Sequence, residues 1–416
     1  MRFCDSRRSI TLIEKGLLMF ATLNLDMYQT AALAVAMLSL GKYLTKKISF
    51  LSKFCIPAPV TGGLVFAVFT CISYALGIIE FSFDKTLGDM CMVFFFTSVG
   101  FKADLKMLKK GGSALGIMLI LLVALIFGQN IVAVTLANLI GESSFIGLCA
   151  GSIPMVGGHG TAVAFGPLLE DFGVTGATTF CTAAATFGLI AGSLMGGPLG
   201  RNLIERKDLL STAVPLEEFE EPEAGKGRAS QIRRYTNVAL TIIVAVGVGS
   251  CISYMLTKSG LTFPVYIGAL LAGAVMRNIS EFTNLYDLNM NGIDRFGDLC
   301  LQMFLGIAMI TLKIWQLVDL ALPLIILLTG QTVFMLLFAR FIVFRAMGRN
   351  YDAAIISSGI CGFGMGAMPN AMANMQATCS RYVHSAKAYL LIPVIGSIFA
   401  DLFNSLIITF FINVLK

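Results

Sequence analysis

The sequence has few charged residues. Asp, Glu, Lys and Arg together make up 13% of its 416 residues, whereas hydrophobic residues make up 56%. A soluble domain carries about 25% charged residues, so this chain has too little polar surface to cover a water-soluble particle. This excludes a series of soluble domains and predicts an all-α polytopic membrane protein. At about 20 residues per transmembrane helix, the chain has room for about ten.

The sequence also lacks the residues and patterns of common enzymes. It has only 2 histidines, and it contains no GxSxG, Walker or HExxH pattern, which excludes a hydrolase triad, a P-loop ATPase and a zinc protease. The 10 cysteines form no CxxC pair and no cluster with histidine, so we expect neither disulfides nor a bound metal cofactor. No basic stripe alternates with aromatic residues, which argues against a nucleic-acid partner. We therefore expect a non-enzymatic protein without a cofactor.

Continuous apolar stretches predict the transmembrane helices. There are ten, at residues 26–45, 60–79, 88–101, 113–140, 177–199, 236–257, 262–277, 297–312, 319–347 and 388–415. Two further stretches, 145–168 and 353–377, are apolar but interrupted by glycine and proline. Non-helical backbone at membrane depth is tolerated only inside protein or beside an aqueous cavity. We therefore predict that these two stretches are glycine-rich re-entrant hairpins or discontinuous helices.

Basic residues predict the orientation, because short cytoplasmic loops concentrate Lys and Arg. If residues 201–234 lie in the cytoplasm, the inner loops collect 22 of the 30 Lys and Arg residues. Both termini then lie outside. A basic segment before the first span opposes this rule, so we interpret residues 1–24 as an extension and expect Met19 or Met27 to be the true start.

Short motifs recur at nearly constant spacing, which indicates a duplicated unit. Leu87 to Cys91 resembles Phe296 to Cys300, and three other pairs recur in the same order, so that the four offsets are 209, 202, 205 and 206 residues. We predict a first repeat at 25–200, a cytoplasmic linker at 201–234 and a second repeat at 235–416. Each repeat holds five spans, an odd number, so the two must be inverted. Inverted repeats with broken helices are typical of secondary transporters.

The glycine-rich stretches supply candidate substrate-binding residues. Glycine lets a ligand approach the backbone closely, and half-helix N-termini attract anions. The alternatives are close helix packing, capping of the tips by the polar side chains and, for His159, a proton relay or a hydrogen bond to the opposite half. The candidates are Ser152, Gly158, His159, Gly160 and Thr161 in the first stretch, and Gly362, Gly364, Gly366, Asn370 and Asn374 in the second.

Polar residues inside apolar helices supply candidate ion ligands. Asp401 lies in the last predicted span with Asn404 one helical turn later, and a buried carboxylate there suits Na⁺ or, alternatively, pairs with a basic residue. Gln129, Asn130 and Gln331 lie inside other long apolar helices. They either line a cavity or join helices by hydrogen bonds. We select Asp401, Asn404, Gln129 and Gln331 as candidate Na⁺ ligands.

Several motifs together resemble the bacterial sodium/glutamate symporter family. They are Gly157 to Thr161, Ala183 to Leu189, Gly196 to Leu199, Asn350 to Ala354, Cys361 to Gly364 and Ala371 to Gln376. The resemblance extends from about Leu25 to the C-terminus. It implies a multi-pass protein of the bacterial inner membrane that imports L-glutamate with Na⁺, has two inverted five-helix halves and forms a homodimer.

Carried over to this sequence, the resemblance matches Gly158 to Thr161 and Gly362 to Asn374 to the family's glycine-rich motifs, and Asp401 to an acidic position in its last helix. Ile360 and Asn370 depart from the polar and small hydroxyl residues expected there. We therefore expect a Na⁺-coupled symporter for L-glutamate that works by alternating access. The alternatives are a Na⁺-coupled carrier of another carboxylate or amino acid, a cation/proton antiporter and an ion channel.

Overall fold

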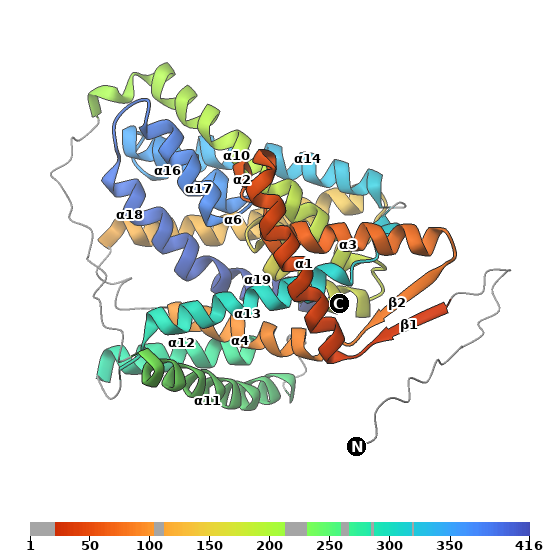
Figure 1. Ribbon diagram of the computed structural model, residues 1–416. Helices are drawn as coiled ribbons and strands as arrows, with labels where there is room; N and C mark the ends of the chain where they lie inside the picture. Colours follow the sequence, from red (N-terminus) through yellow and green to blue (C-terminus); the bar gives the residue numbers. More distant parts are fainter. Residues whose placement is uncertain (1–20, 104–111, 213–230, 259–265, 284–286, 318–319) are drawn as a thin grey trace. The chain divides into compact units, whose positions relative to one another are not determined.

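The computed structural model describes residues 21–103, 112–212, 231–258, 266–283, 287–317 and 320–416, and most of them are helical (Figure 1). The helices before the central gap are α1 (Met27–Lys47), α2 (Ser49–Lys53), α3 (Ala58–Ala75), α4 (Thr86–Lys102), α6 (Gly112–Leu139), α7 (Ser144–Ala150), α8 (Ser152–Met155), α9 (Gly158–Asp171) and α10 (Ala177–Lys207). Those after it are α11 (Gln231–Lys258), α12 (Tyr266–Thr283), α13 (Met290–Ile310), α14 (Ala321–Leu337), α15 (Phe344–Ala346), α16 (Tyr351–Gly364), α17 (Met368–Cys379), α18 (Ala386–Val394) and α19 (Ala400–Leu415).

The helical class predicted from composition is confirmed. Within the described residues, each of the ten predicted spans overlaps a helix or consecutive helices. Among the described residues, six helical segments are long and apolar enough to cross a membrane. They are Ala58–Ala75, Gly112–Leu139, Ala177–Lys207, Val238–Leu256, Ala321–Ala346 and Ala386–Leu415. The chain is therefore a multi-pass membrane protein, and the number of ten crossings stays a prediction.

Two π-helical turns interrupt the long helices of the second half. η3 (Phe338–Val343) separates α14 from α15, and η4 (Ile395–Phe399) separates α18 from α19. Pro393 lies inside α18 just before η4, and a proline lacks the N–H that a regular helical turn requires. Such π-turns are frequent at functional sites, and α19 begins directly after η4 with the segment that contains Asp401.

A short parallel strand pair is the element that sequence analysis missed. β1 (Ala21–Leu25) pairs with β2 (Ile79–Phe83). The alternation of apolar and polar residues from Ile79 to Phe83 is a strand pattern, but a five-residue strand is a weak signal between apolar helices. β1 includes residues 21–24 of the predicted extension, and residues 1–20 lie outside the described residues.

The chain packs into two compact units. Unit 1 comprises Met1–Cys91 and Gln302–Val318, and unit 2 comprises Met92–Leu301 and Asp319–Lys416. Each unit takes residues from both predicted halves, so the boundaries at residues 200 and 235 stay predictions. In unit 1, α1 and α3 approach closely, because a Cβ on Gly62 would overlap the backbone of Met37. Unit 1 also has a cavity of about 390 Å³ beside β2 and Trp315, and none of the predicted site residues lines it.

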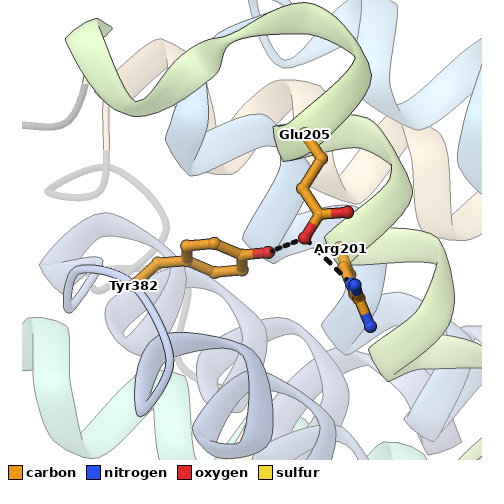
Figure 2. Close-up of polar contacts among 3 residues, drawn as sticks. All are labelled: Arg201, Glu205 and Tyr382. Carbon is orange, nitrogen blue, oxygen red and sulfur yellow. Dashed lines mark hydrogen bonds and ion pairs between the residues drawn. The ribbon is translucent and has the colours of Figure 1, made fainter.

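In unit 2, α10 continues past residue 200 into the predicted linker. Figure 2 shows that Glu205 Oε1 accepts hydrogen bonds from Arg201 Nε at 2.9 Å and from Tyr382 Oη at 2.8 Å. Arg206 and Lys207 lie in the last helical turn, where positive charge complements the helix dipole. The first residues of the predicted linker are thus the last residues of α10, which ends at Lys207.

Candidate functional site

The first glycine-rich stretch is a broken helix. α7 ends at Ala150, α8 covers only Ser152–Met155, and α9 starts at Gly158. Gly158 has a φ of 59°, in the left-handed region that favours glycine. Neither α8 nor α9 has a side-chain cap, since Gly151 and Gly157 occupy the capping positions. The helix is therefore interrupted at the glycines, and no side chain covers the N-terminus of α8 or of α9.

The second stretch forms a pair of helices with a break between them. α16 ends at Gly364, and α17 begins at Met368 with proline in its first turn, a position that proline favours. Ala367 occupies the capping position and makes no side-chain cap bond. The alternative that Ser152, Thr161, Asn370 and Asn374 cap the tips is therefore wrong, because glycine or alanine occupies each capping position.

The two breaks meet inside unit 2. A Cβ on Gly158 would lie 3.3 Å from the carbonyl oxygen of Gly366, so the backbones of the two segments are adjacent. They belong to stretches about 200 residues apart in the sequence. The structure thus brings the candidate residues of both stretches together.

A row of glycines on α10 lets the second stretch pack closely against this helix, and sequence analysis did not recognise it. A Cβ on Gly188 would overlap the carbonyl oxygen of Met365, and one on Gly196 would overlap the amide of Asn374. Gly192 lies between them, with its would-be Cβ 2.9 Å from the carbonyl oxygen of Cys361. The spacing of four places all three on one helix face, and this period was the signal available in the sequence.

Asn370 and Asn374 attach the second break to α10. Asn370 Nδ2 donates to the carbonyl oxygen of Leu189 at 3.0 Å, and Asn374 Nδ2 donates to that of Gly192 at 2.9 Å. Both side chains are buried, with 0% and 4% of their surface exposed. With its nitrogen committed, the Oδ1 atom of Asn370 has no partner.

Gln129 and Gln331 form a second hydrogen-bonded chain. Gln129 Nε2 on α6 donates to the carbonyl oxygen of Gly364 at 2.6 Å, and Gln331 Nε2 on α14 donates to that of Gln129 at 2.7 Å. The alternative that these residues join helices is therefore confirmed. Each Oε1 atom nevertheless remains buried without a partner.

Asn130 and Asn404 hold the backbone of Ser152 from two sides. The Ser152 N–H donates to Asn130 Oδ1 at 2.9 Å, while Asn404 Nδ2 donates to the Ser152 carbonyl oxygen at 3.1 Å. A Cβ on Gly157 would crowd Thr161 and Asn404, so α19 lies against the first break. Ser152 Oγ, Asn130 Nδ2 and Asn404 Oδ1 are left without partners.

His159 and Asp401 have different surroundings from those expected. His159 Nε2 lies 2.9 Å from Thr186 Oγ1 on α10. This partner belongs to the same half, so the alternative of a hydrogen bond to the opposite half is wrong. Asp401 is half-buried on α19, one turn before Asn404. Within the described ranges no ion pair involves Asp401, although Lys102 interacts with it electrostatically.

The site is distinguished by carboxamide oxygens without partners. In Gln129, Gln331, Asn370 and Asn404 the nitrogen donates to a backbone carbonyl, which fixes the orientation of the amide and leaves its oxygen unpaired. A buried polar group without a partner costs about 1–3 kcal/mol. Neutral oxygens are suitable ligands for a hard monovalent cation such as Na⁺. In the part of the chain that the structure describes, no cluster of His, Cys, Asp or Glu could hold a metal ion.

Comparison with known proteins identifies the family. The model of the sodium/glutamate symporter family matches residues 23–384. The chain belongs to this family. It is 37% identical to the sodium/glutamate symporter of Escherichia coli (strain K12) over 94% of this chain and 98% of that protein. It is 38% identical to the sodium/glutamate symporter of Haemophilus influenzae over 91% of this chain and 95% of that protein. Asp401 and Asn404 lie beyond the residues that the family model matches.

Proposed function

We propose that this protein is a Na⁺-coupled symporter that imports L-glutamate across the bacterial inner membrane by alternating access. The observation that carries the proposal is the set of four buried carboxamide oxygens without partners, beside two uncapped helix breaks. Membership of the sodium/glutamate symporter family supports the same activity.

Na⁺ binds to oxygen atoms of Gln129, Gln331 and Asn404, with Asp401 as the charged group of the site. The three amide oxygens are oriented by hydrogen bonds that their own nitrogens make. Asp401 precedes Asn404 by one turn of α19, and a half-buried carboxylate stabilises a cation that has lost part of its hydration shell.

Glutamate binds where the two breaks meet. The N-termini of α9 and α17 have no side-chain cap, so the positive ends of both helix dipoles and the first N–H groups of α9 are available to carboxylates. In the first turn of α17, Pro369 has no N–H, and the Asn370 N–H donates to the Ala367 carbonyl oxygen. The adjacent backbones of Gly158 and Gly366 place both termini in the same region of unit 2. The substrate-binding residues are Ser152, Gly158, His159, Gly160, Thr161, Gly362, Gly364, Gly366, Asn370 and Asn374.

The fold consists of ten transmembrane helices in two inverted repeats, each with a re-entrant hairpin. Packing between glycines supports the repeat. Gly62 of α3 meets the backbone of α1 near Gly41, and Gly268 of α12 meets the backbone of α11 at Gly249. The two pairs are separated by 206 and 208 residues, within the range of the sequence offsets. A duplicated helix pair accounts for both contacts.

The linker at residues 201–234 lies in the cytoplasm, and the protein forms a homodimer. The described part of α10 supports this orientation, because Arg201, Arg206 and Lys207 lie at its end, as the distribution of positive charge requires on the inner face. The dimer follows from the family resemblance, and light scattering of the detergent-solubilised protein measures it.

Uptake of labelled L-glutamate into proteoliposomes tests the function. We expect accumulation when an inward Na⁺ gradient is present and none when K⁺ replaces Na⁺. Uptake that does not depend on Na⁺ would contradict the proposal. A channel would show flux that does not saturate with glutamate, and an antiporter would move protons without glutamate. Competition by other carboxylates distinguishes glutamate from a related substrate.

A further inference from the structure

Asn130 differs from the other buried carboxamides of the site. It lies on α6 with 0% of its surface exposed. Its oxygen accepts the Ser152 N–H at 2.9 Å, whereas its nitrogen has no partner. In Gln129, Gln331, Asn370 and Asn404 the opposite holds, and the oxygen is unpaired. Asn130 therefore presents a hydrogen-bond donor in a region where the other four amides present acceptors.

The orientation of this amide follows from its neighbours. If the Asn130 amide were reversed, Nδ2 would face the Ser152 N–H, and two donors would oppose each other. A Cβ on Gly151 would lie only 2.5 Å from Asn130 Oδ1, so glycine at that position allows the close approach. The Nδ2 atom is thus directed away from the Ser152 N–H, and a buried donor left unpaired is costly.

The charge of the surrounding residues indicates what this donor binds. Residues 144–171 and 351–379, which contain both breaks, include no lysine and no arginine. Within these two stretches, only neutral donors and helix N-termini can bind a carboxylate. Ser152 Oγ is also buried without a partner. The backbone N–H of the same residue donates to Asn130 Oδ1. The two side chains offer an N–H and an O–H to an anion.

We propose that Asn130 Nδ2, together with Ser152 Oγ, binds a carboxylate of the transported solute and makes Asn130 a residue that determines specificity for an acidic substrate. This inference rests on the proposed function. It assigns opposite roles to adjacent residues of α6, because Gln129 offers an oxygen to the cation and Asn130 offers a nitrogen to the anion.

The substitution N130D replaces the donor by a negatively charged acceptor. Aspartate has nearly the same size and keeps an oxygen for the Ser152 N–H, but it replaces Nδ2 by a second oxygen that repels a carboxylate. We expect the KM for glutamate to rise by about tenfold or more, since hydrogen bonds to charged groups are strong. The Na⁺ concentration for half-maximal uptake should not rise, because the added negative charge cannot weaken the binding of a nearby cation. The matched control is N138D on the exposed part of α6, where Asn138 Oδ1 accepts from Ser144 Oγ at 3.0 Å; its KM should equal that of the wild type.

Competition with two amide analogues separates direct contact from a structural role. Glutamine lacks the side-chain carboxylate, and glutamate α-amide lacks the α-carboxylate. If Asn130 binds one carboxylate, N130D loses affinity for glutamate and for the analogue that keeps this carboxylate, but not for the analogue that lacks it. An equal loss for all three solutes, or an unchanged KM for glutamate, would overturn the inference. Absence of Na⁺-dependent uptake by the wild type would instead refute the proposed function.

Discussion

At the scale of the residue, the site is defined by which atom of each side-chain amide already makes a hydrogen bond within the protein. Gln129, Gln331, Asn370 and Asn404 each commit their nitrogen to a backbone carbonyl. These bonds connect segments distant in sequence and at the same time leave four buried oxygens without a partner. Structural and functional roles therefore coexist in one side chain, and the two alternatives for the glutamines are not exclusive.

Asp401 gives a prediction at this scale. In D401N the side chain keeps its size but loses the negative charge, so we expect the Na⁺ concentration for half-maximal uptake to rise by about tenfold, equivalent to ~1.4 kcal/mol. Na⁺ titration of glutamate uptake measures the effect. D208N is the control, because Asp208 is exposed at the end of α10. An unaltered titration for D401N would exclude Asp401 as an ion ligand.

At the scale of the element, α10 supports the second break. The backbone of Met365 and the side chain of Asn374 pack against the glycine face of α10. The carbonyl oxygens of Leu189 and Gly192 accept hydrogen bonds from the side-chain amides of Asn370 and Asn374. Small residues are typical of close helix packing in membranes. The helix thus positions the second break through its backbone as well as its surface.

Two glycines of α10 provide a matched pair of variants. In G188A the new Cβ overlaps the rigid backbone carbonyl of Met365, whereas in G197A it meets nothing within 4 Å. We expect G188A to lose about 1–3 kcal/mol of stability and most of its uptake. G197A should keep its uptake and gain up to about 1 kcal/mol, because alanine favours helix over glycine. Thermal unfolding in detergent measures both, and equal melting temperatures would contradict the proposed packing.

At the scale of the whole molecule, the ratio of Na⁺ to glutamate decides whether transport moves net charge across the membrane. Glutamate carries one negative charge, so two or more Na⁺ per glutamate bring net positive charge inward, and we predict at least this ratio. An inside-negative potential of 100 mV then contributes about 2.3 kcal/mol per net charge, or roughly fiftyfold in accumulation at equilibrium. Proteoliposomes with an imposed K⁺ diffusion potential measure this dependence. Accumulation independent of potential would correspond to a single Na⁺.

Much of the architecture was predictable because it depends on local composition. Long apolar runs form helices in a membrane, because the backbone must satisfy its own hydrogen bonds there. Glycine and proline interrupt such helices, so both the helices and the two breaks could be predicted. β1 and β2 were missed because five residues carry little periodic signal. The hydrogen bond between His159 and Thr186 was not among the alternatives considered, since nothing in the sequence distinguishes Thr186 from other hydroxyl groups. The glycine face of α10 was visible as a period of four but was not recognised.

The sequence by itself determined that this is a helical membrane protein with two interrupted apolar stretches, because burial of apolar residues in lipid and the conformational freedom of glycine are properties of the residues themselves. Only the tertiary structure decided what each polar side chain does. Gln129 meets Gly364, and Asn404 meets Ser152, across more than 200 residues of chain. Which atom of an amide is engaged and which remains for a ligand depends on the carbonyl or N–H group that packing brings beside it.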